Sequence, residues 1–125
     1  MSRLLRSIVA LAWLLLAAQP ASAGEFLAGF DDLPVMPGLA AVDGAGIVFD
    51  TPAGRIIEGY AAGTVTEDAV RSFYGKTLPQ LGWKPVARDE YRREGEHLKI
   101  GFKGEDRTLT VRFTLSPGKN ASRGG

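Results

Sequence analysis

Cysteine is absent from this sequence of 125 residues, and histidine occurs once, at position 97. The lack of cysteine excludes disulfide bonds, thiol chemistry and thiolate-bound metal or iron–sulfur centres. His97 has no oriented partner that the sequence identifies, and His, Asp and Glu residues do not occur at metal-ligand spacing. We therefore expect no metal site, no cofactor and no catalytic residue, and we expect that the protein is not an enzyme.

Charge of one sign is lacking as well, because 15 Lys and Arg residues are balanced by 14 Asp and Glu residues. A chain with so small a net charge has no overall field that would attract nucleic acid. The sequence also lacks the G-x-x-x-x-G-K-[ST] phosphate loop. We expect no nucleic-acid partner.

Long apolar runs are missing except for one of 12 residues near the start of the chain. Two arginines precede this run and an Ala-Ser-Ala site follows it, which is the layout of a secretory signal peptide comprising residues 1–23. The run is shorter than the about 20 residues needed to span a bilayer. We expect cleavage between Ala23 and Gly24, export to the bacterial periplasm and no transmembrane anchor after cleavage; an uncleaved anchor is the alternative.

Residues 24–46 are rich in turn-forming Asp, Pro and Gly and show no helical or strand periodicity. We expect an extended N-terminal arm that attaches through its apolar side chains to a domain formed by residues 47–116. Residues 117–125 (PGKNASRGG) predict a polar, flexible tail. The apolar side chains of the arm are those of Leu33, Val35, Met36 and Leu39.

The pattern within residues 47–82 predicts a β-hairpin followed by a helix. The apolar segments Ile47–Asp50 and Arg55–Tyr60 flank Thr-Pro-Ala-Gly, a sequence typical of a type I turn. A helix is expected to begin after Thr66, whose hydroxyl is suited to cap it, and to end at Gly82. Pro79 inside this helix predicts a kink or a tightened last turn.

From residue 83 onward the apolar period changes to two, as expected for strands with one buried face. The predicted strands are residues 83–88, 90–94, 98–103 and 107–116. The resulting fold class is α+β, with one helix packed on one face of an antiparallel, meandering sheet in the order β-β-α-β-β-β-β. The predicted core consists of apolar residues from all of these elements: Ile47, Phe49, Ile56, Val70, Phe73, Leu81, Trp83, Leu98, Ile100, Phe102, Leu109, Val111 and Phe113.

The predicted helix and the strand after it share a motif, V-x-x-F-Y-x-x-x-L-x-x-L-G-W, which runs from Val70 to Trp83. The motif resembles a helix-to-strand element that recurs in small exported bacterial domains of uncharacterised function, and the similarity extends over about residues 47–117. It implies an exported helix-on-sheet domain. No catalytic residue comes with the motif, because its positions serve packing: Phe73 and Leu81 anchor the helix.

The outward positions of the last strands carry the candidate binding residues. Lys99, Lys103 and Arg112 have the parity that places them on the solvent side of the sheet. These cations suit an anionic partner: a lipid head group, a wall polymer or the acidic patch of an envelope protein. The alternative is an ordinary solvated sheet face whose charges limit aggregation. The leading hypothesis is a non-enzymatic periplasmic accessory or binding domain that contacts another component of the cell envelope.

Two alternative functions would use other residues. Tyr74 and Trp83 combine apolar rings with polar atoms, which makes them candidates for the rim of a pocket between helix and sheet in a small-ligand carrier. A wall-polymer hydrolase would use paired carboxylates, which occur at residues 31–32, 67–68, 89–90 and 105–106. Each acidic pair also has a structural explanation in the arm, in a turn or at the start of the helix, and the hydrolase is therefore the remote alternative.

Overall fold

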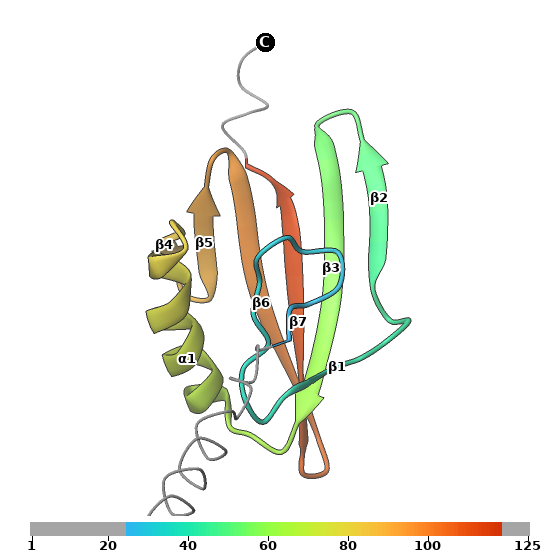
Figure 1. The fold of residues 1–125 in the computed structure, drawn as a ribbon, viewed down its shortest axis with the longest axis vertical. Helices are drawn as coiled ribbons and strands as arrows, with labels where there is room; N and C mark the ends of the chain where they lie inside the picture. Colours follow the sequence, from blue (N-terminus) through green and yellow to red (C-terminus); the bar gives the residue numbers. More distant parts are fainter. Residues whose placement is uncertain (1–24, 119–125) are drawn as a thin grey trace, which may run out of the picture.

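The structure is a computed structural model that describes residues 25–118. In this range one helix accompanies a seven-stranded antiparallel sheet, which confirms the predicted α+β class (Figure 1). The predicted signal peptide and residues 119–125 of the predicted tail lie outside the described residues. Between residues 25 and 118, no helix is long and apolar enough to cross a membrane. The elements are β1 (Ala40–Ala41), β2 (Ile47–Thr51), β3 (Gly54–Gly63), α1 (Glu67–Gln80), β4 (Lys84–Ala87), β5 (Glu90–Arg93), β6 (Glu96–Glu105) and β7 (Thr108–Pro117).

The strands do not lie in the sheet in the order of the chain. Strands β4 to β7 form the expected meander, but β3 pairs with β7, so the sheet order is β1-β3-β7-β6-β5-β4, with β2 beside β3. The helix α1 therefore connects β3 and β4, which are separated in the sheet by three other strands. The short strand β1 was not predicted; it pairs Ala40 and Ala41 of the arm with the end of β3.

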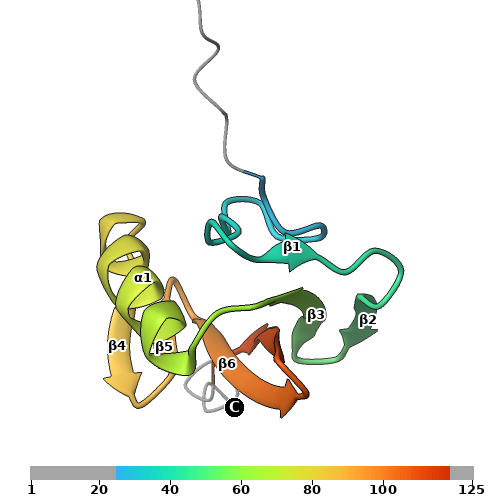
Figure 2. The same ribbon diagram turned by 90° about the horizontal axis from the view of Figure 1, so that it is seen from below.

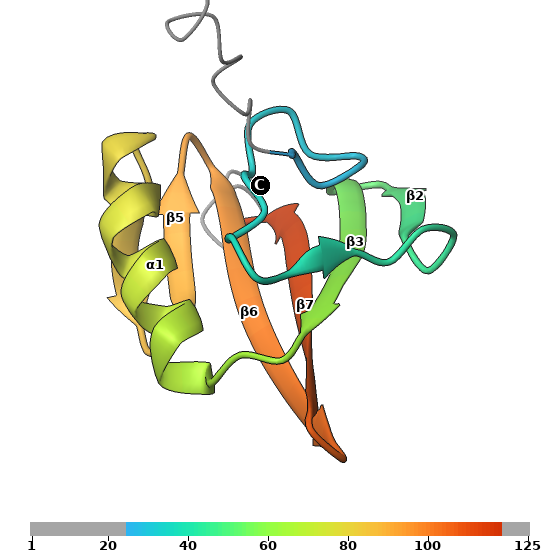
Figure 3. The ribbon, with the colours of Figure 1, turned by 60° about the horizontal axis from the view of Figure 1, so that its bottom comes forward.

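The helix and the arm cover the same face of the sheet (Figure 2). α1 lies toward β4 and β5, and the arm (residues 25–46) lies toward β3 (Figure 3). The arm contributes five buried apolar residues to the core. Three of the four arm residues that we expected to attach, Leu33, Val35 and Leu39, are among them, and the fourth, Met36, is half-buried against the same core. We call the opposite face of the sheet, which neither segment covers, the outer face. The buried arm residues are Leu27, Phe30, Leu33, Val35 and Leu39.

The helix begins and ends as its capping residues predict. The hydroxyl of Thr66 accepts a hydrogen bond of 3.1 Å from the backbone N–H of Ala69. At the other end Gly82 has a φ of 93°, a conformation that glycine adopts without steric cost. The backbone N–H groups of Trp83 and Gly82 donate to the carbonyl oxygens of Leu78 and Pro79, which is the Schellman arrangement. The last turn is thus tightened around Pro79, as expected.

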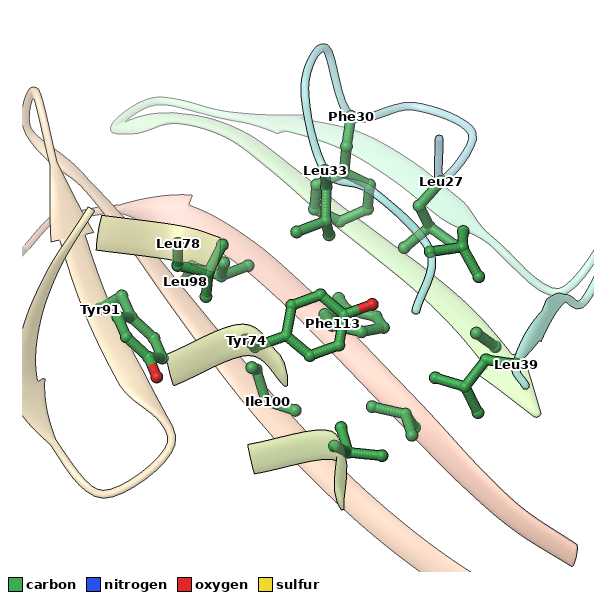
Figure 4. Packing of buried hydrophobic residues seen from close by; sticks show 14 of the residues in the cluster. Leu27, Phe30, Leu33, Leu39, Tyr74, Leu78, Tyr91, Leu98, Ile100 and Phe113 are labelled. Atoms are coloured by element: carbon green, nitrogen blue, oxygen red, sulfur yellow. The ribbon is translucent and has the colours of Figure 1, made fainter. Parts of the chain in front are cut away.

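The buried cluster lies between the sheet and the two segments that cover it (Figure 4). Most of the predicted core residues are buried or pack against this cluster. Ile47 and Phe49 are exceptions, because 49% and 46% of their surface remains exposed. Their register explains the difference: Ile47 pairs with Glu58 and Phe49 pairs with Ile56, and these four residues point to the outer face.

The adjacent residues Ile56 and Ile57 of β3 show how packing of the arm determines which side chains of this strand are buried. Ile57 is buried, whereas Ile56, which we predicted to be buried, is only half-buried. Gly59 shares the inner parity of Ile57, and a Cβ atom built there would lie only 2.7 Å from Leu27 Cδ2. The arm therefore packs directly on the backbone of β3 at Gly59, and this contact requires the inner face of β3 to carry Ile57.

Candidate binding surface

The three predicted cationic residues lie together on the outer face. Lys99 and Lys103 are on β6, and Arg112 is on the neighbouring strand β7. The register places Arg112 directly opposite Gly101, which stands between the two lysines. All three cationic residues are exposed. Because alternate residues of a strand are roughly 7 Å apart, these side chains form a short line along β6, which we call the basic row.

Gly101 leaves room for the Arg112 side chain between the two lysines. A Cβ atom built at Gly101 would lie 3.7 Å from both Nε and Nη2 of Arg112. The guanidinium group therefore lies over the glycine at the distance of an ordinary van der Waals contact with such a Cβ atom, so a side chain longer than that of alanine would meet it. Gly101 was not among the predicted site residues, although a glycine inside a strand often marks the close approach of another group.

Within the part of the chain that the structure describes, no carboxylate forms an ion pair with the basic row. None of the ion pairs found within residues 25–118 includes Lys99, Lys103 or Arg112. Other arginines are paired: Arg93 forms hydrogen bonds of 2.7 and 3.1 Å to the carboxylate of Asp32. This hydrogen bonding raises the pKa of Arg93 and lowers the pKa of Asp32. The carboxylates of residues 25–118 thus leave the cations of the basic row without an ion-pair partner.

The surroundings of the basic row are mixed in charge. Strand pairing places Arg92 opposite His97 and Glu90 opposite Lys99 on the outer face. Oε1 of Glu90 lies 3.5 Å from Nε2 of His97, and the carboxylate of Glu58 accepts a hydrogen bond of 3.5 Å from the hydroxyl of Thr114. An anion that binds the basic row must therefore fit between these carboxylates. This arrangement favours a partner whose anionic groups are spaced to match the cations over a partner with a diffuse negative charge.

An apolar margin borders the basic row on the side of β2 and β3. Tyr60 is the direct cross-strand neighbour of Arg112. Beyond it, Ile56 pairs with Phe49 on the same face. The outer face therefore changes from mainly cationic on β6 and β7 to mainly apolar on β2 and β3, where the carboxylate of Glu58 stands between Tyr60 and Ile56. The strand order produces this gradient, which the sequence pattern did not predict.

Tyr74 lies in the core and does not rim a pocket, contrary to our expectation. Its side chain is fully buried, and its ring contacts Phe73 and Phe113 edge to face. Its hydroxyl accepts a hydrogen bond of 3.1 Å from the N–H of Met36 and donates one of 2.8 Å to the carbonyl oxygen of Pro34. Burial raises the pKa of Tyr74 to about 12. The polar atom of Tyr74 therefore holds the arm to the helix.

Trp83 lines a small hollow, but between the arm and the sheet instead of between the helix and the sheet. The hollow has a volume of about 200 Å³ and is also lined by Asp32 and Arg93. The Trp83 ring lies 4.3 Å from the Arg93 guanidinium, an attractive cation–π arrangement. Pockets for small ligands usually have volumes of about 300–1,000 Å³. Trp83 and Arg93 thus mainly join the arm to the sheet.

The acidic pairs are distributed over the fold, and members of three of them take part in separate contacts. Asp32 binds Arg93, Glu67 and Asp89 bind Arg71, and Glu90 lies beside His97. Among the residues that the structure describes, no group of three or more His, Asp and Glu side chains could hold a metal ion.

No family model, curated protein or solved structure matches this chain. The likeness of the Val70–Trp83 motif to exported bacterial domains therefore stays a prediction.

Proposed function

We propose that this protein is a non-enzymatic binding domain of the bacterial periplasm that holds an anionic component of the cell envelope on its basic row. The observation that carries the proposal is the position of the Arg112 guanidinium, which lies across Gly101 between two exposed lysines. The arginine fork suits bidentate binding of a phosphate or carboxylate, and the lysines add charge on either side.

Two further features support an envelope partner. Residues 1–23 have the layout of an export signal. The apolar margin beside Arg112, formed by Tyr60, Ile56 and Phe49, offers contact to the non-polar part of an amphipathic ligand. A lipid head group, an acidic wall polymer and an acidic protein surface all present the anion that the row requires.

The proposal is tested with two probes that carry different anions: vesicles containing phosphatidylglycerol, and purified peptidoglycan sacculi. The variant K99Q/K103Q removes two cations from the row, and K76Q/R88Q removes two exposed cations from elsewhere on the surface. A basic residue near an anionic membrane contributes about 1 kcal/mol. We therefore expect K99Q/K103Q to bind about thirty-fold more weakly to the probe that the protein recognises, and K76Q/R88Q to bind nearly as the unmodified protein does.

A second pair of variants separates geometry from net charge. Gly101→Val displaces the Arg112 guanidinium without changing the charge of the protein, whereas nothing lies within 4 Å of a Cβ atom at Gly104. We expect Gly101→Val to weaken binding and Gly104→Val to leave it unchanged. Equal losses for K99Q/K103Q and K76Q/R88Q, or no effect of Gly101→Val, would contradict a defined site. If neither probe binds, crosslinking in the exporting cell tests the remaining partner, an acidic envelope protein.

A further inference from the structure

The two edges of the sheet differ in their protection against strand pairing. β4 forms one edge, and it contains Lys84, Pro85 and an irregular register between Pro85 and Ala87. Lysine, proline and bulges are the features with which proteins prevent an edge strand from pairing with another chain. β2 lies at the other edge, beside β3 only (Figure 1), and its five residues, Ile-Val-Phe-Asp-Thr, include neither lysine nor proline.

The unprotected edge is also apolar on both faces of the sheet. Val48 is 56% exposed on the inner side, and its neighbours Ile47 and Phe49 are about half exposed on the outer side. A hollow of about 230 Å³ lies between the arm, β2 and β3, and it is lined by Val48, Val42 and Ala28 together with the acidic residues Asp43 and Glu58. Exposed apolar side chains that gather in this way indicate a contact surface.

The sequence of β2 is complementary to itself in the antiparallel direction. A two-fold axis through Val48 places Val48 opposite its own copy and Ile47 opposite the second copy's Phe49. The same axis places Asp50 opposite the second copy's Gly46, which has no side chain to oppose the carboxylate. Directly opposed apolar pairs stabilise strand pairing, and like charges in opposition destabilise it. This register pairs every apolar residue of β2 with another apolar residue and brings no like charges together.

We propose that two copies of this chain associate through antiparallel pairing of their β2 strands around a two-fold axis at Val48, which joins the two sheets into one. Cyclic two-fold dimers are the commonest oligomers, and their interfaces are self-complementary in this manner. The pairing involves residues 46–50 of each copy, of which 47–50 belong to β2, fewer than the roughly 20–30 residues a side of a standard interface. The dimer is therefore weak and reversible. Both outer faces lie on the same side of the joined sheet, so each dimer presents two basic rows on that side.

The absence of cysteine from the chain permits a direct test with single-cysteine variants. Val48→Cys places two thiols opposite each other at the two-fold axis, where opposed Cβ atoms are about 5 Å apart. Val86→Cys is the matched control, because Val86 is 53% exposed on the edge strand β4, compared with 56% for Val48. Under mild oxidation we expect several-fold more disulfide-linked dimer from Val48→Cys than from Val86→Cys, independent of any ligand.

Sedimentation of the unmodified protein provides the second measurement. We expect its weight-average mass to rise with concentration toward that of a dimer, and Val48→Lys to remain monomeric with an unchanged circular dichroism spectrum, because the added charges repel each other at the axis. Val86→Lys should associate as the unmodified protein does. A monomer at every concentration, together with equal crosslinking of Val48→Cys and Val86→Cys, would overturn the proposal and leave the edge to a segment of another protein. A higher yield from Phe49→Cys than from Val48→Cys would overturn the register.

Discussion

The replacement Tyr74→Phe tests whether the arm is held to the helix by a single hydroxyl. In the structure this hydroxyl bridges two backbone groups of the arm, the N–H of Met36 at 3.1 Å and the carbonyl oxygen of Pro34 at 2.8 Å. Phenylalanine retains the ring and its contacts with Phe73 and Phe113 but loses both hydrogen bonds. The packing of the core is thereby left almost unchanged, so the measured effect reports on the bridge.

The expected loss follows from the burial of these groups. Each hydrogen bond contributes about 1 kcal/mol to stability, and a buried group left without a partner costs about 1–3 kcal/mol. Because both backbone groups are partly buried, we expect Tyr74→Phe to lower the free energy of unfolding by about 2–4 kcal/mol. For a domain of this size that corresponds to a decrease in Tm of roughly 10–25 °C.

The assay is urea denaturation followed by circular dichroism, combined with limited proteolysis of the arm. Tyr60→Phe is the control, since the Tyr60 hydroxyl forms no hydrogen bond with the residues that the structure describes, and we expect a change within about 0.5 kcal/mol. Tyr74→Phe should also expose the arm to cleavage under conditions in which the Tyr60 variant stays intact. A loss below about 1 kcal/mol, or equal cleavage of both variants, would refute the bridge.

The alkaline stability of the protein depends on the same side chain. Burial raises the pKa of Tyr74 from 10.0 to about 12, so the folded state binds its proton more tightly than the unfolded state does. This contribution is complete below pH 10 and is lost as the pH rises from 10 toward 12. The Tyr74→Phe variant should therefore lose less stability than the unmodified protein as the pH rises from 10 toward 12. An equally steep decrease in the free energy of unfolding in this pH range would contradict the role of Tyr74.

Two other contacts of the arm give further predictions. Gly63→Ala should destabilise the protein by several kcal/mol or prevent docking of the arm, because the added Cβ atom would overlap the carbonyl oxygen of Gly38. Gly104→Ala is the control and should be neutral, because a Cβ atom at Gly104 meets no atom within 4 Å. Equal urea midpoints for both variants would disprove the close approach of Gly63 and Gly38. Asp32 has a lowered pKa, mainly because of its hydrogen bond with Arg93, so its contribution to stability is present above pH 3.8 and is lost as the pH falls below that value. The Asp32→Asn variant should therefore be less stable at neutral pH, and its free energy of unfolding should fall less as the pH is lowered. Urea denaturation at neutral pH and at a pH below 3.8 measures both effects.

The elements that depend on neighbouring residues could be predicted from the sequence. Thr66 and Gly82 determine the ends of α1 through hydrogen bonds within the same helix. The alternation of residues 98–115 determines that Lys99 and Lys103 point away from the buried face, and Arg112 follows the same rule. These features need no information about the rest of the chain, and they include the three cations of the candidate site.

The features that depend on distant residues were decided by the tertiary structure alone. The pairing of β3 with β7 places Tyr60 beside Arg112, and it leaves β2 at an unprotected edge. The hydroxyl of Tyr74 forms its hydrogen bonds with residues 38 and 40 positions earlier in the chain. The arm packs against Gly59, and Ile57 on the same face of β3 is therefore buried. Periodicity states which side chains of one strand share a face, but it does not state which face is covered or by what. That choice depends on the free energy of packing between segments far apart in the chain, which only the folded protein determines.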